Sequence, residues 1–188
     1  MLCARAALAE VLPLFNASHA IFERLAQADP GNAGWQRELS VAHNNIGDVL
    51  RAQGNLPAAL DAYNASLAIA ERLARADPGH AGWQRALAIC NERLGDMFER
   101  AGRASEARQA FERALGVYEG LIGRNPGDIP SKVFSVVPRW RLSRLDPDRA
   151  REHLQAAIET LKPLAAAGRL DSNRLKWLDQ LEAELAKL

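Results

Sequence analysis

The sequence of 188 residues is poor in cysteine, almost neutral overall and without a long apolar run. Cys3 and Cys90 stand alone, with no CxxC motif and no Cys/His pair at metal-ligand spacing, so neither a disulfide framework nor a zinc site is expected. The net charge of +1 provides no overall field that would favour nucleic acid, a membrane surface or an acidic substrate. No stretch approaches the roughly 20 apolar residues of a membrane span. Arg5 and Glu10 interrupt the apolar core that a signal peptide needs, and we therefore expect a cytoplasmic protein.

Sequence signatures of catalysis are missing as well. The chain has no phosphate-binding glycine loop, no HExxH motif and no GxSxG motif. Its four histidines, His19, His43, His80 and His153, are scattered. No pair of carboxylates comes with the nucleophile, base and oxyanion donors that a catalytic site needs. We therefore predict that the protein is not an enzyme and that it binds no cofactor and no metal.

What the sequence does contain is an internal repeat in a composition typical of a soluble folded protein, with 48% hydrophobic and 25% charged residues. The abundance of Ala and Arg favours a bacterial source. The stretch Ala28–Arg37, ADPGNAGWQR, returns as ADPGHAGWQR at Ala76–Arg85, 48 residues later. A third, fainter copy begins at Asn125-Pro126-Gly127. A period of this length indicates a repeating scaffold rather than an active site built twice.

Each repeat is expected to form two helices. Apolar residues recur every three or four positions over residues 33–53, the spacing of one helical face. Gly54 follows at a position that favours a left-handed helix end, and Pro57 suits the first turn of the next helix. Asp77-Pro78-Gly79 ends that second helix, because proline removes a helical hydrogen bond and glycine adopts turn dihedrals. No segment alternates with a period of two residues, so we predict an all-α fold without a sheet.

The turn that joins one repeat to the next has an expected role for each of its parts. Asp-Pro-Gly ends one helix, and Asn32 or His80 caps the start of the next. Trp35 and Trp83 are expected to be buried anchors that hold each new hairpin on the one before it.

The segment after residue 127 departs from the repeat. Pro138 should kink the first helix there or mark where that helix begins. Asp146-Pro147 predicts the cap and first turn of a helix of about 20 residues, which Gly168 ends. Asp171-Ser172 predicts the start of a final helix. Terminal repeats are expected to be atypical, because one of their faces has no neighbour.

Three glycines, Gly116, Gly120 and Gly123, lie within the second helix of the second repeat. Each weakens that helix by roughly 1 kcal/mol relative to Ala. They either permit the close approach of a neighbouring helix or simply leave this helix loose.

Small and large residues follow one pattern in both full repeats. Ile46-Gly47-x-x-Leu50, Gly54, Ala59, Tyr63 and Ser66 recur as Leu94-Gly95-x-x-Phe98, Gly102, Ala107, Phe111 and Ala114. The pattern resembles the tetratricopeptide repeat (TPR), whose usual period is 34 residues and therefore shorter than the one seen here. The resemblance implies an all-α, right-handed superhelix, or α-solenoid, of antiparallel helix hairpins with a C-terminal capping helix. It divides a single repeat domain, 1–188, into a half repeat (1–28), repeat 1 (29–76), repeat 2 (77–124), a degenerate repeat 3 (125–170) and a capping helix (171–188).

A TPR resemblance also implies a concave groove, lined by side chains of the first helices, that binds a peptide or a protein. The corresponding positions are Asn44, Asn45, Asp48 and Arg51 in repeat 1, Glu92, Arg93, Asp96 and Glu99 in repeat 2, and Trp140, Arg141 and Arg144 in the degenerate repeat. Negative charge at Asp48 and Asp96 argues against the Lys/Asn carboxylate clamp of chaperone-binding TPRs. An ordinary solvated helix face is the alternative reading for all of these positions.

The segment Lys132–Arg151 is the most basic part of the chain, with six basic residues against Asp146 and Asp148. Together with Trp140 it suits an anion, an acidic partner or nucleic acid phosphate. A solvated helix face, with Trp140 in the core, is the favoured interpretation, so we expect neither nucleic acid nor membrane binding.

We predict a protein–protein interaction scaffold without catalysis, whose partner the sequence does not name. The alternative is a regulatory or oligomerising segment of a larger bacterial signalling protein or enzyme. Met1 enters in mid-repeat, so the half repeat at 1–28 leaves one helix face without its usual neighbour. That face is expected to be covered by an upstream segment, by a second copy in a homo-oligomer or by an atypical cap.

Overall fold

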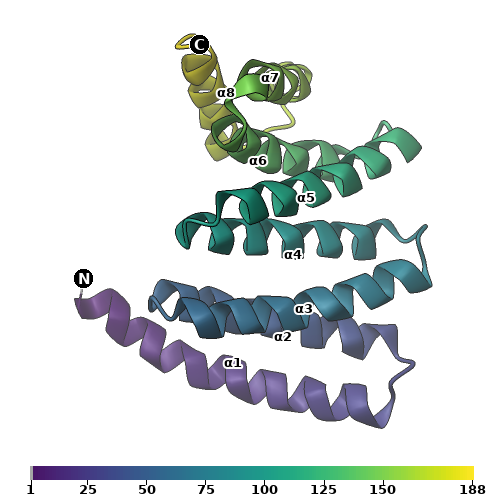
Figure 1. Ribbon diagram of the computed structural model, residues 1–188. Coiled ribbons are helices and arrows are strands. Elements are labelled where there is room, and N and C mark those ends of the chain that lie inside the picture. Colours follow the sequence, from purple (N-terminus) through teal and green to yellow (C-terminus); the bar gives the residue numbers. More distant parts are fainter. Residues whose placement is uncertain (1) are drawn as a thin grey trace. The chain divides into compact units, whose positions relative to one another are not determined.

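The computed structural model describes residues 2–188, with side chains from residue 11 onwards, so the side chains of Cys3, Arg5 and Glu10 lie outside the described residues. Across residues 2–188 the chain is helical and has no strand, which confirms the predicted all-α fold. The elements are α1 (Leu2–Ala28), α2 (Ala33–Ala52), α3 (Leu56–Ala76), α4 (Ala81–Arg100), α5 (Ala104–Arg124), α6 (Ile129–Leu145), the 3₁₀ turn η1 (Pro147–Arg149), α7 (Ala150–Ala166) and α8 (Ser172–Leu185) (Figure 1). Two compact units divide the chain, Met1–Met97 and Phe98–Leu188, with their boundary inside α4.

The turns before α2, α4 and α6 begin the next helix in the same way. Asn32, His80 and Asp128 each accept a hydrogen bond at 3.2 Å from the backbone N–H three residues later. Each bond satisfies one of the N–H groups that the first turn of a helix leaves without an intrahelical partner. The predicted capping roles of Asn32 and His80 are confirmed, and Asp128 repeats them in the third turn.

A glutamine in the same turns joins successive helices, and the sequence interpretation did not assign it a role. Gln36 Nε2 donates to the carbonyl oxygen of Ala26 in the last turn of α1, at 3.3 Å. Gln84 Nε2 donates to the equivalent Ala74 at the end of α3, at 2.9 Å. Gln36 is buried and accepts a hydrogen bond from Arg72 of α3. Both glutamines satisfy a carbonyl that the end of a helix leaves free.

The two repeat tryptophans are half-buried, so the expectation of fully buried anchors is wrong in this respect. Trp35 packs against Phe22 of α1, with the ring centroids 6.4 Å apart. Trp83 stacks on His80 of its own helix start, at 4.1 Å. In α2 the neighbouring Gln36 is buried, whereas Trp35 is half-buried.

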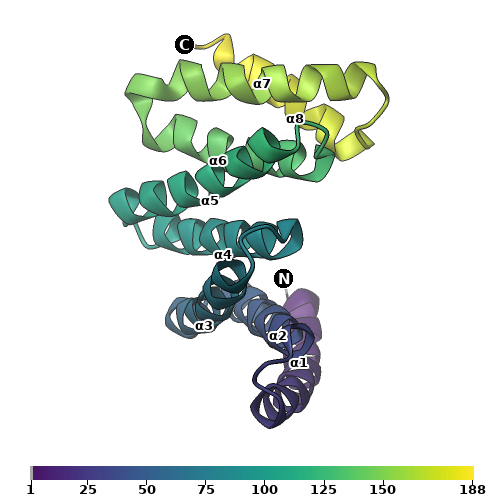
Figure 2. The same ribbon diagram turned by 90° about the vertical axis from the view of Figure 1, so that its right-hand side faces the viewer.

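Helices α2 and α3 form an antiparallel hairpin in the first unit (Figure 2). The turn between them contains Gly54 with a φ of 82°, in the left-handed region where glycine is strongly favoured. Gly47 of α2 faces the fully buried ring of Tyr63 of α3. A Cβ atom at Gly47 would lie 2.5 Å from Tyr63 Cε1. The Gly and aromatic positions of the repeat pattern therefore form one close helix–helix contact.

A buried polar network also lies in the first unit. Ser66 Oγ on α3 is 2.8 Å from Ser40 Oγ on α2 and 3.2 Å from Cys90 Sγ on α4. Asn44 Nδ2 donates to the same sulfur at 3.7 Å. Burial raises the pKa of the Cys90 thiol, although the hydrogen bonds from Ser66 and Asn44 oppose that shift. Cys90 is therefore a neutral core thiol that fixes the register of three helices.

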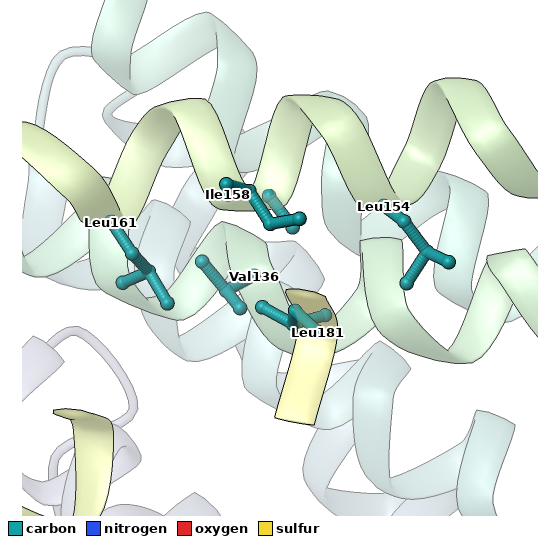
Figure 3. Packing of buried hydrophobic residues seen from close by; sticks show 6 residues of the cluster. Val136, Leu154, Ile158, Leu161 and Leu181 are labelled. Carbon is teal, nitrogen blue, oxygen red and sulfur yellow. The ribbon is translucent and has the colours of Figure 1, made fainter. Parts of the chain in front are cut away.

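The second unit has two hydrophobic clusters. One consists of Ala107, Phe111 and Leu115 of α5 with Leu142 of α6. The other joins α6, α7 and α8, and its side chains converge from three directions in Figure 3. Its buried members are Val136, Leu154, Ala157, Ile158, Leu161 and Leu181. Leu181 is the buried residue of α8, so this cluster is what holds the predicted C-terminal helix on the unit.

One of the two alternatives given for Pro138 is excluded by the structure, and the cap predicted at Asp146 is wrong. Helix α6 begins at Ile129 and continues through Pro138, so it does not begin at the proline. Pro138 is buried, and packing of α6 against both α5 and α7 compensates for the lost helical hydrogen bond. Asp146 does not cap a helix with its side chain. Its buried carboxylate instead pairs with Arg108 of α5 at 2.9 Å, and α7 begins after the 3₁₀ turn.

Candidate functional site

Four of the predicted partner-binding residues form a charge cluster in the first unit. Asp48 and Arg51 lie on α2, and Arg93 and Asp96 lie on α4. Arg93 Nη2 is 2.8 Å from Asp48 Oδ2, and Arg51 Nη1 is 3.3 Å from Asp96 Oδ2. Arg51 also lies 3.7 Å from Asp48 of its own helix. The four charges balance to zero, so this surface, which we call the α2–α4 cluster, attracts neither sign of charge at long range.

The α2–α4 cluster connects to the core through Tyr63. The Tyr63 hydroxyl donates to Asp48 Oδ1 at 2.7 Å. Burial and the hydrogen bond to this carboxylate raise the pKa of Tyr63, so the phenol stays neutral and acts as a donor. The side chains of the four charged residues are between 23% and 35% exposed. They are ordered by their neighbours and still reachable from solvent.

The other predicted residues of the first two repeats lie in different environments. Asn44 is buried and directs its amide to Cys90, so it belongs to the polar core rather than to an accessible surface. Asn45 and Glu92 are half-buried on α2 and α4. Glu99 lies in the last turn of α4 and belongs to the second unit, where its Oε2 is 3.2 Å from Arg141 Nη1.

The predicted residues of α6 meet the C-terminal helix. Trp140 Nε1 donates to Glu184 Oε2 at 2.8 Å, and Arg144 Nη2 lies 2.7 Å from Glu184 Oε1. The Arg144 guanidinium also lies over the Trp140 ring, 5.4 Å from its centroid. Although desolvation acts in the opposite direction, hydrogen bonds from Arg144 and Trp140 lower the pKa of Glu184. Helix α8 thus orients both side chains by a single carboxylate.

A pocket of about 280 Å³ opens beside this contact. Its lining residues are Val137, Trp140, Arg141, Arg144 and Trp177. Two indole rings and a valine provide apolar surface, and two guanidinium groups provide cationic donors. This combination suits an apolar or aromatic side chain that carries, or lies next to, a carboxylate.

The basic character of the segment Lys132–Arg151 is largely cancelled in three dimensions. Arg139 Nη2 lies 2.5 Å from Glu119 of α5, and Arg149 Nη2 lies 2.6 Å from Glu152 of α7. Arg141 and Arg144 pair with carboxylates of α4 and α8, as described above. The segment therefore presents paired charges rather than a cationic stripe.

The lining residues Val137 and Trp177 were not among the predicted site residues, and neither was Glu184, which holds Trp140 and Arg144 beside the pocket. Glu184 and Trp177 lie on α8, outside the repeat pattern from which the groove positions were transferred. The final helix itself was predicted, and the tryptophan within it was the remaining sequence signal.

None of the helices described here is long and apolar enough to cross a membrane. Among the side chains from residue 11 onwards, no group of three or more His, Cys, Asp or Glu residues is arranged to hold a metal ion.

Part of the chain matches a known repeat family. The family model of the tetratricopeptide repeat matches residues 38–120. No curated protein matches the chain. Among solved structures, the de novo designed helical repeat protein DHR64 has 12% identity and a TM-score of 0.37, with 97% of this chain and 95% of that chain covered. BtubC (BKLC) from P. vanneervenii has 14% identity and a TM-score of 0.35, with 97% and 93% covered.

The family match runs from within α2 to within α5 and includes the Gly47–Tyr63 contact and the Gly54 turn. It agrees with the helix order, the short turns and the packing of consecutive helices inside each unit. Residues 38–120 are therefore similar to the tetratricopeptide repeat, with a repeat of 48 residues in place of the usual 34.

Proposed function

We propose that this chain is a protein-binding scaffold that contacts a peptide or protein partner through side chains of its first helices and carries no catalytic activity of its own. TPR repeats generally mediate protein–protein interaction, and this supports the general assignment. The pocket beside α8 carries the more specific part of the proposal, because tryptophan and arginine are the residues enriched at the energetic centres of interfaces.

The chemistry of that pocket defines the kind of segment that it would hold. Trp140 and Trp177 offer flat apolar walls, and Arg144 is 49% exposed at the rim. A partner segment with a large apolar side chain next to an acidic group would bury that side chain between the indoles. Its carboxylate would share Arg144 with Glu184, so no buried charge would be left unpaired.

A peptide-display experiment tests this proposal. A library of random peptides is selected against the intact chain, and the selected peptides are measured against Trp177→Ala, Arg144→Ala and the control Arg151→Ala, an exposed arginine of α7. We expect selected peptides to combine an apolar anchor with acidic residues. Each pocket variant should lower affinity by about tenfold or more, which corresponds to about 1.4 kcal/mol.

The control variant should leave the affinity unchanged, and circular dichroism and thermal melts should show that all three variants fold. Selected peptides that bind the pocket variants as well as they bind the unmodified chain would contradict the assignment of this pocket.

A second function, as an oligomerising or regulatory segment, is favoured by one observation on α1. Leu14 and Ile21 are seven residues apart on one side of the helix and are 70% and 47% exposed. A second copy of the chain, seated on this face, would cover both. The unmodified chain should then form a dimer as its concentration rises in light-scattering measurements, and Ile21→Lys should remain monomeric. A chain that stays monomeric at every concentration would exclude self-association through α1.

A further inference from the structure

Two histidines from different helices meet in the first unit, although the sequence places them 24 residues apart. His19 lies on α1 and His43 lies on α2, and their Nε2 atoms are 3.3 Å apart. The two rings are half-buried and meet edge to face, with an interplanar angle of 71° and centroids 4.4 Å apart. Neither histidine belongs to the repeat pattern or to the charge clusters described above.

The separation of the two nitrogens matches one edge of a transition-metal site. Two imidazole nitrogens bound to a tetrahedral Zn²⁺ at about 2.0–2.1 Å lie roughly 3.3–3.4 Å from each other. Imidazole is a preferred ligand of Zn²⁺ and of the neighbouring late first-row ions. For both lone pairs to meet at one ion, the rings must turn about their χ2 torsions from the present edge-to-face arrangement.

A carboxylate stands at the outer side of the pair. Glu23 Oε2 is 4.0 Å from His19 Nδ1, one turn further along α1. Metal-binding histidines usually donate their second ring N–H to a carboxylate or a carbonyl, which fixes the tautomer. When the metal occupies Nε2 of His19, the ring proton resides on Nδ1 and faces Glu23. One ring now carries its proton on Nε2, and on metal binding that proton relocates through solvent to Nδ1 of the same ring, so both rings stay neutral and no net proton is released.

We propose that His19 and His43 form a two-histidine binding site for Zn²⁺ or a similar divalent transition-metal ion, with Glu23 as the outer-sphere partner of His19. No third protein ligand gathers there among the described side chains, so water completes the coordination shell. Bound metal links α1 to α2. Because the pair is assembled only in the folded chain, metal binding stabilises this helix contact by mass action.

The test uses the full-length chain without a histidine tag. Zn²⁺ is titrated by calorimetry, and thermal melts are recorded with and without Zn²⁺. The variants are His19→Gln, His43→Gln and Glu23→Gln. Two controls, His80→Gln and His153→Gln, each remove another possible nitrogen ligand, at a residue outside the His19–His43 contact.

We expect one Zn²⁺ per chain and a melting temperature that rises until the site is saturated. Loss of a well-placed outer-sphere partner lowers metal affinity by roughly 10- to 100-fold. Glu23→Gln should lower the Zn²⁺ affinity by less than this, because Glu23 Oε2 is as far as 4.0 Å from His19 Nδ1. His19→Gln and His43→Gln should each exceed that loss, and both controls should bind like the unmodified chain.

Zinc affinity unchanged in both histidine variants would overturn the proposal. A stoichiometry of one ion per two chains, with a doubled mass in light scattering, would show a site between chains and would also overturn it. If His43→Gln does not fold, Co²⁺ absorption of the unmodified chain decides the question. Ligand-field bands without thiolate charge transfer support histidine ligation, whereas thiolate bands contradict it.

Discussion

Replacement of Gly47 by alanine tests the close contact on which the α2–α3 hairpin depends. The added Cβ would lie 2.5, 2.8 and 2.9 Å from three atoms of the Tyr63 ring. The ring is fully buried, and its hydroxyl is held by Asp48 at 2.7 Å, so it cannot move aside without breaking that bond. Overpacking of this kind costs about 1–3 kcal/mol.

The helix propensity of alanine works in the opposite direction and must be separated from the steric cost. Alanine stabilises a helix interior by about 1 kcal/mol relative to glycine. Gly120 of α5 is the matched control, because a Cβ at that position meets nothing within 4 Å. Gly120→Ala should therefore stabilise its helix by about 1 kcal/mol. The difference between the two variants isolates the steric cost of Gly47→Ala, about 1–3 kcal/mol.

Native-state hydrogen exchange measures both changes, because it reports on the amides of each unit separately. Amides of α2 and α3 should exchange faster in Gly47→Ala, and amides of α5 should exchange more slowly in Gly120→Ala. Equal stabilisation by the two substitutions would refute the reasoning. It would show that the Tyr63 ring moves aside without any loss of stability.

Three further predictions concern α8, the turn glutamine, and the histidines His43 and His153. Leu181→Ala should cost about 2–5 kcal/mol and expose α8 to limited proteolysis, whereas the exposed Leu175→Ala should change the free energy of unfolding by less than about 0.5 kcal/mol. Gln36→Leu should cost about 1–3 kcal/mol in urea unfolding, because the carbonyl of the buried residue Ala26 loses its hydrogen bond from the Gln36 amide. Burial lowers the pKa values of His43 and His153 below 6.5. The neighbouring His19 lowers the pKa of His43 further, and Arg149 does the same for His153. The unfolded chain then binds more protons, so the free energy of unfolding should fall as the pH drops below about 6.5 in urea titrations, and less so in a variant with both histidines replaced by glutamine.

The helix boundaries of the repeats could be predicted from the sequence because the signals that end a helix are local. The left-handed residue Gly54 and the capping side chain of Asn32 act on backbone groups within a few residues. Asp146 shows where such signals fail. Its position before a proline suits a helix cap, but its carboxylate pairs with Arg108 of another helix instead. The sequence does not show which of these two interactions is the stronger.

The candidate site was predictable only in part. The repeat pattern placed Asp48 and Arg93 on first helices, but it did not show that the two side chains neutralise each other. That pairing depends on how α2 and α4 are aligned, because the two residues are 45 positions apart in the sequence. The hydrogen bond from Trp140 to Glu184 of α8 was even harder to predict, because Glu184 lies outside the repeat and has no counterpart in it.

The glutamine and capping bonds of the turns have a consequence for how such a chain can lengthen. Gln84 reaches Ala74 over ten residues, and His80 caps its helix over three. A gene duplication that copies one period of 48 residues therefore copies a complete turn with both of these hydrogen bonds. The new turn between repeats then forms without any compensating mutation. The salt bridges between first helices are different, because each requires a suitable residue in the adjoining copy. Newly duplicated units are thus joined from the outset, while the charges on their first helices remain free to diverge.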